Sequence, residues 1–314
     1  MPELWRHGAS ELAGMIRAKE VSSREVVEAH LARIEAVNPA VNAVTVVLAE
    51  TALAAADAAD DARAGGERGG ALAGVPITVK ENVEVAGSAI TQGLVAFEGM
   101  LPPADAPHVA QLRAAGAIPF ARTNLPDFGM RWHTDNALHG ATRNPWDASR
   151  TPGGSSGGEA AALATGMTPL GLGNDYGGSL RVPSQFCGTA ALKPTYGRIA
   201  DHRATLPAEP PITLQLFAVE GPMARHVQDL RLAFEAMCGP DPRDRAGCLS
   251  RCAARPPRRR YGWPCAPTRA AWASTPTSRP GCAPRPTPSP MRATPSRTPT
   301  LPGWPMRAPC GAPS

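Results

Sequence analysis

Three segments carry residues whose type and setting could do chemistry, and the first contains Lys80. This lysine follows the apolar, β-branched run GVPITV at residues 74–79, in a chain with three lysines and 29 arginines. On a buried strand, the charged form of a lysine is disfavoured, so its neutral amine becomes available as a base. A lysine on an edge strand, with its ammonium group extended to solvent, explains the same pattern equally well.

The second segment, residues 151–164, reads TPGGSSGGEAAALA and predicts a Gly/Ser loop that enters an Ala-rich helix. Free backbone N–H groups at such a helix start can hold an anion, but the Gly-Lys-Ser/Thr ending of a phosphate loop is missing. Residues 154–158 also match the G-x-S-x-G nucleophile elbow, centred on Ser156. An elbow needs a preceding strand, and RNPWDASRTP does not have a strand pattern. A flexible surface loop remains the simpler alternative.

The third segment, residues 171–181, reads GLGNDYGGSLR. Gly177 and Gly178 allow several consecutive backbone N–H groups to point at one place beside the hydroxyl of Ser179. Such donors stabilise the oxyanion that forms during acyl transfer. A Gly-Gly-Ser turn alone is common and mostly structural. Together, however, the three segments offer a nucleophile, a proton acceptor, a relay and oxyanion donors, which are the parts of a serine hydrolase.

The elements that must position these residues alternate between helix and strand patterns. Ser10 and Leu12 suggest a short first helix, and Ser22 or Ser23 caps a second that ends near residues 38–39. Residues 50–64 predict an Ala-rich helix, residues 74–85 a buried strand with a turn, and residues 108–124 a helix, a glycine and a strand. The alternation predicts an α/β fold.

Composition excludes several classes of protein. Residues 1–244 hold 20 basic and 27 acidic side chains, whereas residues 245–314 hold 12 Arg and no acid. The overall charge of +5 therefore comes from the tail, and the acidic body argues against nucleic acid as a partner. The first residues do not resemble a secretory signal, and no run reaches the ~18 apolar residues of a membrane span. Two body cysteines, Cys187 and Cys238, fit a reducing cytoplasm. The histidines show no paired ligand spacing and the tail cysteines no C-x-x-C, so we expect no metal and no cofactor.

The tail differs sharply from the rest of the chain. Residues 251–314 contain 16 Pro, one Leu and no Val, Ile or Phe, so we expect them to be disordered. One alternative is an Arg-rich arm that binds nucleic acid. We favour the hypothesis that a GC-rich gene is translated out of frame here, because a reading shifted by one base can give a helix pattern followed by a strand. The sequence thus predicts a core at residues 1–243 and a tail at residues 244–314.

In their order and letters, the three segments resemble the amidase signature family over nearly all of residues 10–243. The resemblance implies a mixed β-sheet flanked by helices, which would be incomplete at the C-terminus because family members continue beyond residue 243. It also implies a Ser–cis-Ser–Lys triad, in which Ser179 is the nucleophile, Ser155 the bridging serine after a cis peptide bond, and Lys80 the base. The implied oxyanion donors are the backbone N–H groups of Tyr176, Gly177, Gly178 and Ser179, with Asp175 and Arg181 as braces of the turn.

The function implied by this resemblance is hydrolysis of a small-molecule amide. Neutral Lys80 would accept, through Ser155, the proton of Ser179, which would attack the carbonyl and form an acyl-enzyme that water cleaves. No nucleic acid partner is expected, and a homodimer is left open. Two alternatives remain: an inactive truncated fragment, and the A-type subunit of a tRNA-dependent amidotransferase, whose pattern typically has Gln where this chain has Val182. The chain departs from the family pattern at two further places, with Asn174 where the family usually has Thr and Ala190 or Ala191 where it usually has Gly. Neither departure is expected to touch the triad.

Overall fold

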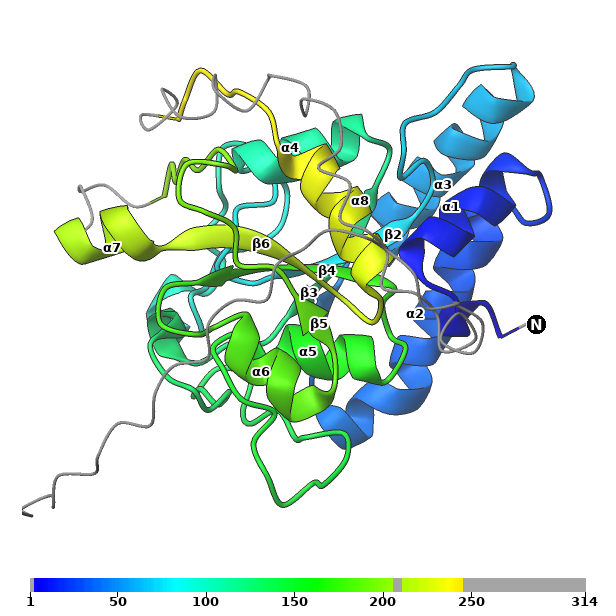
Figure 1. Cartoon of the computed structure of the whole chain (residues 1–314). Coiled ribbons are helices and arrows are strands. Elements are labelled where there is room, and N and C mark those ends of the chain that lie inside the picture. Colours follow the sequence, from blue (N-terminus) through cyan, green and yellow to red (C-terminus); the bar gives the residue numbers. More distant parts are fainter. Residues whose placement is uncertain (1–2, 206–210, 245–314) are drawn as a thin grey trace, which may run out of the picture. The chain divides into compact units, whose positions relative to one another are not determined.

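A six-stranded mixed sheet forms the centre of the computed structural model, which describes residues 3–205 and 211–244 (Figure 1). The strand order is β1-β3-β2-β4-β6-β5. β2 runs parallel to β3 and β4, whereas β1 is antiparallel to β3, and β6 is antiparallel to β4 and β5. The strands are β1 (Val44–Val47), β2 (Pro76–Lys80), β3 (Ile118–Thr123), β4 (Leu170–Asp175), β5 (Ala190–Ala191) and β6 (Val219–Ala224).

The described residues form eight α-helices, of which α5 and α6 lie on one side of the sheet and α4 and α8 on the other (Figure 1). They are α1 (Ala9–Arg17), α2 (Ser23–Val41), α3 (Ala49–Ala64), α4 (Pro107–Ala114), α5 (Gly157–Ala164), α6 (Arg181–Cys187), α7 (Ile212–Phe217) and α8 (Val227–Met237). Short 3-10 turns lie at Leu4–Arg6, Val95–Phe97 and Asp127–Gly129. The predicted α/β class with a mixed sheet is confirmed. Residues 245–314 lie outside the described residues. The predictions that fall on them, a disordered tail and an out-of-frame origin, stay predictions, as does the division at residues 243–244.

The central strand β2 sends alternate side chains to opposite faces of the sheet. Ile77 and Val79 pack into the apolar cluster that contains α1, α4 and α8. Thr78 lies on the other face, where its hydroxyl bonds to Glu159 of α5. Because side chains alternate along a strand, Lys80 shares the face of Thr78. The period of β2 therefore directs the lysine toward the Gly/Ser loop at the start of α5.

Helix α2 starts where the sequence predicted and ends later. Ser22 is its N-cap and forms a capping box with Glu25, in which each side chain bonds to the backbone N–H of the other residue. The end predicted near residues 38–39 is wrong, because the helix includes Pro39 and continues to Val41. Asn42, in the left-handed region at φ 55°, ends the helix, and its N–H bonds to the carbonyl of Asn38 at 2.7 Å.

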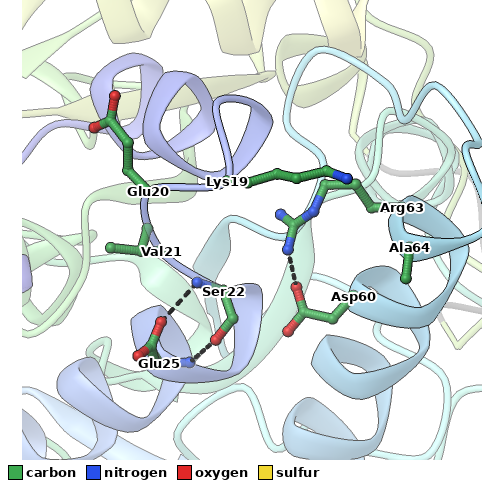
Figure 2. Close-up of a pocket in the computed structure, with 8 residues that line it drawn as sticks. All are labelled: Lys19, Glu20, Val21, Ser22, Glu25, Asp60, Arg63 and Ala64. Carbon is green, nitrogen blue, oxygen red and sulfur yellow. Dashed lines mark hydrogen bonds and ion pairs between the residues drawn. The ribbon is translucent and has the colours of Figure 1, made fainter.

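Beside this helix start, the surface has a hollow of about 320 Å³ between the α1–α2 turn and α3 (Figure 2). Two of its five charged side chains pair with each other, because Arg63 bonds to Asp60 at 2.8 Å, and a third, Glu25, takes part in the capping box. None of the site residues predicted from the sequence lines it. The lining residues are Lys19, Glu20, Val21, Ser22, Glu25, Asp60, Arg63 and Ala64.

Helix α5 approaches the sheet closely because its first turn begins with glycines. The N–H of Gly158 donates to the carbonyl of Asn124, just beyond β3, at 3.2 Å. A Cβ at position 158 would overlap the backbone N of Asn124 and lie 2.6 Å from its carbonyl oxygen. Backbone atoms cannot move aside as a flexible side chain can, so this position requires glycine.

We expect Gly158→Ala to lower the free energy of unfolding by about 1–3 kcal/mol, because the added methyl group overpacks the contact between α5 and β3. Gly14→Ala in α1 is the matched control, since a Cβ there meets nothing within 4 Å. That change should raise stability by about 0.5–1 kcal/mol, the gain of Ala over Gly inside a helix. Urea unfolding of both variants measures the difference, and equal effects would contradict the packing argument.

Candidate active site

Lys80 is the last residue of β2, between β3 and β4, and its side chain is fully buried. Its Nζ donates to Ser155 Oγ and to Asn174 Oδ1, each at 2.7 Å. The alternative of an edge-strand lysine that extends to solvent is therefore wrong. The strand holds the amine inside the protein and in direct contact with a hydroxyl of the Gly/Ser loop.

The surroundings of Lys80 favour its neutral form. Burial lowers its pKa from 10.5 to about 7, because the ammonium form loses its hydration. Neighbouring charges act in both directions: Glu220 raises the pKa, and Arg203 lowers it. A large fraction of this amine is therefore uncharged at neutral pH, as a general base requires.

A pH profile follows from this pKa. Below about pH 7 Lys80 carries a proton and cannot accept another, so any reaction that needs it as a base should slow about tenfold per pH unit. Above that value the rate should level off. The rate of covalent labelling by a serine-directed fluorophosphonate, followed across neutral pH, measures the profile, and a flat profile would contradict the expectation.

A second buried group titrates in the same range. Glu159 of α5 accepts hydrogen bonds from Thr78 and, at 2.7 Å, from Thr123. Burial raises its pKa to about 7, against the opposing effect of these hydroxyls. Glu159→Gln separates the two groups, because the acidic limb of the profile should persist in this variant if Lys80 causes it.

Ser155 lies in the loop before α5 and is 1% exposed. The peptide bond that precedes it, Gly154–Ser155, is cis. The neighbouring Ser156 is also buried, and its hydroxyl lies 3.5 Å from the carbonyl oxygen of Asn174. In the described residues 124–156 the chain forms no strand. The strand that a nucleophile elbow needs before Ser156 is thus missing, which argues against the elbow interpretation.

Ser179 lies in the turn between β4 and α6, and its residue is 7% exposed. The N–H of Ser156 donates to the carbonyl of Ser179 at 3.2 Å, so the two Gly/Ser segments meet here. Asp175 braces the turn, as the resemblance implied: its carboxylate accepts from the N–H groups of Gly178 and Leu180, at 2.8 and 3.0 Å. Arg181 bonds to both oxygens of Asp175, at 2.8 and 2.9 Å.

The predicted oxyanion donors differ in what they contact. The N–H of Gly178, a residue at φ 113°, is already bound to Asp175. Within the described residues, the N–H groups of Tyr176, Gly177 and Ser179 have no hydrogen-bond partner. Trp132 contacts this turn, since its indole Nε1 donates to the carbonyl of Gly177 at 3.0 Å. The Trp132 residue is otherwise largely exposed, at 62%. Three of the four predicted donors are therefore free to bind a ligand.

One expectation about the site is wrong. Asn174 was not expected to touch the triad residues, yet its Oδ1 accepts directly from Lys80. Its amide also donates to Asn82 Oδ1 at 3.0 Å and to Glu220 Oε1 at 3.5 Å. Sequence reasoning missed both partners. The available signal was the place of Asn174 in the chain, on the strand that leads directly into the Gly-Gly-Ser turn.

Arg122, on β3, is a further residue that sequence reasoning missed. Its guanidinium is fully buried and donates to the main-chain carbonyls of Val79 and Lys80, each at 3.2 Å, and to those of Glu81 and Val83. These carbonyls converge on one side chain, so the chain turns after Lys80. The strand with a turn predicted over residues 74–85 is thus a strand that ends at residue 80 and a turn that follows it. Arg122 holds the backbone that carries the amine.

Fold and site together define the class: an α/β protein with a buried lysine–serine pair beside a glycine-rich serine turn. A family model described as amidase matches residues 25–255. The chain belongs to this family, the amidase signature family.

Two curated relatives and one solved structure illustrate the similarity. Indoleacetamide hydrolase from Bradyrhizobium diazoefficiens is 49% identical over 241 residues, 77% of this chain and 46% of the relative. The A-type subunit of glutamyl-tRNA(Gln) amidotransferase from Acidothermus cellulolyticus is 47% identical over 244 residues, 78% of this chain and 47% of the relative. The structure of a bacterial aryl acylamidase of the amidase signature family has a TM-score of 0.72 and 33% identity, with coverage of 78% of this chain and 50% of that one.

The chain spans about half the length of the curated relatives it matches. Within residues 3–205 and 211–244, no helix has the length and apolar character needed to cross a membrane. In the same residues, no group of three His, Cys, Asp or Glu side chains is arranged to hold a metal ion.

Proposed function

We propose that this chain carries the catalytic centre of an amide hydrolase, with Ser179 as nucleophile, Ser155 as bridging serine and Lys80 as base. The observation that supports it most is the 2.7 Å hydrogen bond between the buried amine of Lys80 and the hydroxyl of Ser155. A neutral amine can take the proton of Ser155 as Ser155 takes that of Ser179. Ser179 Oγ then bonds to the amide carbon.

The rest of the cycle uses the same groups. The oxyanion would be stabilised by the free N–H groups of Tyr176, Gly177 and Ser179. Ser155 then gives its proton to the departing amine and takes one back from Lys80, so that the C–N bond breaks and an acyl-Ser179 ester remains. Water, deprotonated by the same relay, cleaves this ester and regenerates the hydroxyl.

We propose a small carboxamide with an apolar acyl group as the substrate. The side chains around the turn support this, because Trp132 and Tyr176 are 62% and 40% exposed and flank Gly177. The name of the relative from B. diazoefficiens makes indoleacetamide the first compound to test. Release of ammonia from it by the purified chain would support the proposal. Absence of both ammonia from a series of amides and fluorophosphonate labelling would contradict it.

An amidotransferase subunit is the second candidate, because several curated relatives carry that name. Val182, where that branch typically has Gln, argues against it. The two functions differ in a simple assay: a hydrolase releases ammonia from a free amide alone, whereas the subunit would need its partner chains and a charged tRNA. A cytoplasmic location and a homodimer remain parts of this proposal, and an inactive fragment is the outcome if neither assay gives a signal.

A further inference from the structure

A buried polar cluster adjoins Lys80 through the second hydrogen-bond partner of its amine, Asn174. Its centre is the amide of Asn174, which accepts from Lys80 Nζ at 2.7 Å. On the other side, the NH₂ group of the same amide faces two oxygens, Asn82 Oδ1 at 3.0 Å and Glu220 Oε1 at 3.5 Å. All four residues are at most 8% exposed. The proposed function uses Lys80 but none of the other three.

We propose that Glu220 is a positioning residue for Lys80: its carboxylate fixes the orientation of the Asn174 amide and, through it, the amine. An amide can point its oxygen or its NH₂ group to either side, and a neighbouring asparagine such as Asn82 can turn with it. The ionised carboxylate of Glu220 cannot turn in this way, because both of its oxygens accept. With its Oε1 on one side of the amide, and with the lone pair of the Lys80 amine kept for the proton of Ser155, one arrangement remains in which every contact pairs a donor with an acceptor. The inference rests on the proposed role of Lys80 as base.

The fold holds Glu220 in place for this role. Asn174 and Glu220 are directly paired residues of the antiparallel strands β4 and β6. Arg203 donates to Oε1 of Glu220 at 3.0 Å, so this oxygen faces two donors. Oε2 points instead toward Nε2 of His108, 3.7 Å away, and neither atom has a hydrogen bond within the described residues.

The charged groups that act on Glu220 come from three other segments. They belong to Lys80 on β2, His108 on α4, and Asp201 and Arg203 in the segment after β5. Burial raises the pKa of Glu220, while His108, Arg203 and Lys80 act in the opposite direction. A proton taken up by this carboxyl would be carried on Oε2, because Oε1 already faces two donors. Oε1 therefore stays an acceptor for Asn174 in either protonation state.

The position of Glu220 has a measurable consequence for Lys80. A negative charge stabilises the ammonium form, so its removal in Glu220→Gln should lower the titration midpoint of Lys80 by about 0.5–1 pH unit. The glutamine oxygen can still accept from Asn174, so labelling by fluorophosphonate well above the midpoint should stay within about threefold of wild type. Glu220→Leu cannot hold the amide, and labelling at the same pH should fall at least about tenfold.

Nuclear magnetic resonance of ¹³C-labelled lysine tests this on the full chain. The chain has three lysines, so loss of one Cε signal in Lys80→Met assigns the resonance. Glu84→Gln is the control: this buried carboxylate holds the same segment through the N–H groups of Ala204 and Thr205, at 3.1 and 2.7 Å, without contact to Asn174. In Glu84→Gln, the titration midpoint of Lys80 should equal that of the wild type.

The outcomes separate this inference from the proposed function. A lower midpoint in Glu220→Gln, with an unchanged one in Glu84→Gln, supports the positioning role even if no variant is labelled, in which case only the hydrolase proposal fails. An unchanged midpoint in Glu220→Gln overturns the inference. It is equally overturned if folded Glu220→Leu is labelled at the wild-type rate. Should the Leu variant fail to fold, the Gln titration decides alone.

Discussion

Ser179→Ala should abolish covalent labelling by a fluorophosphonate and reduce amide hydrolysis at least about 10³-fold, because the reacting oxygen is gone. The variant should fold as well as the wild type. The Ser179 hydroxyl has no hydrogen-bond partner within the described residues, and the backbone of its turn is held by Asp175. We therefore expect the thermal midpoint to change by no more than about 2 °C. Gel fluorescence of the labelled protein and a thermal melt provide the two readouts.

Ser156→Ala is the matched control for this prediction. Ser156 is the centre of the G-x-S-x-G match, is fully buried, and lies beside the proposed bridging serine. Its side chain makes one long contact, 3.5 Å to the carbonyl of Asn174, so its loss should leave labelling within about threefold. Labelling that survives in Ser179→Ala and disappears in Ser156→Ala would contradict the assignment and favour the elbow interpretation.

Lys80→Met should lower the labelling rate and amide hydrolysis by about 10³-fold at mildly alkaline pH, the size of effect that a general base contributes. Methionine has nearly the length of lysine and no proton-accepting nitrogen. The acidic limb near pH 7 should disappear with the amine, since burial lowers the pKa of Lys80 to about that value. Initial rates across the pH range measure both effects.

The stability of this variant separates chemistry from folding. Lys80 is a buried amine, and its replacement by an apolar side chain removes the cost of its desolvation. We expect Lys80→Met to unfold at an equal or higher temperature than the wild type while its activity is lost. Lys19→Met, at an exposed lysine, should change neither property. A Lys80→Met protein with full labelling would refute the role of base.

Much of the fold could be predicted from local patterns. The alternation of helix and strand patterns indicated the α/β class, Ser22 marked the start of α2, and Gly65 follows the end of α3. The misplaced end of α2 and the exact end of β2 have physical causes that local patterns do not carry. Pro39 lies in the last turn of α2. β2 stops at residue 80, where the carbonyls that follow bond to Arg122, a residue of the neighbouring strand β3.

The proposed catalytic residues could be predicted from sequence motifs, whereas the residues that hold them in place could not. Lys80, Ser155 and Ser179 lie in recognisable segments, and the alternation along β2 directs Lys80 to the face that carries Ser155. No recognisable sequence segment marks Glu220, Arg203 or Arg122. Each acts through a contact between distant strands or loops, and a buried charge can be identified only when the groups that surround it are known.

A double-mutant cycle on Lys80→Met and Ser155→Ala tests the central claim most directly, with the second-order rate constant of fluorophosphonate labelling at mildly alkaline pH as the readout. If the two residues form one proton relay to Ser179, either change alone breaks it, and the double variant should be no slower than the slower single one, within about threefold. Losses that multiply in the double variant would show that the residues act independently and would contradict the relay.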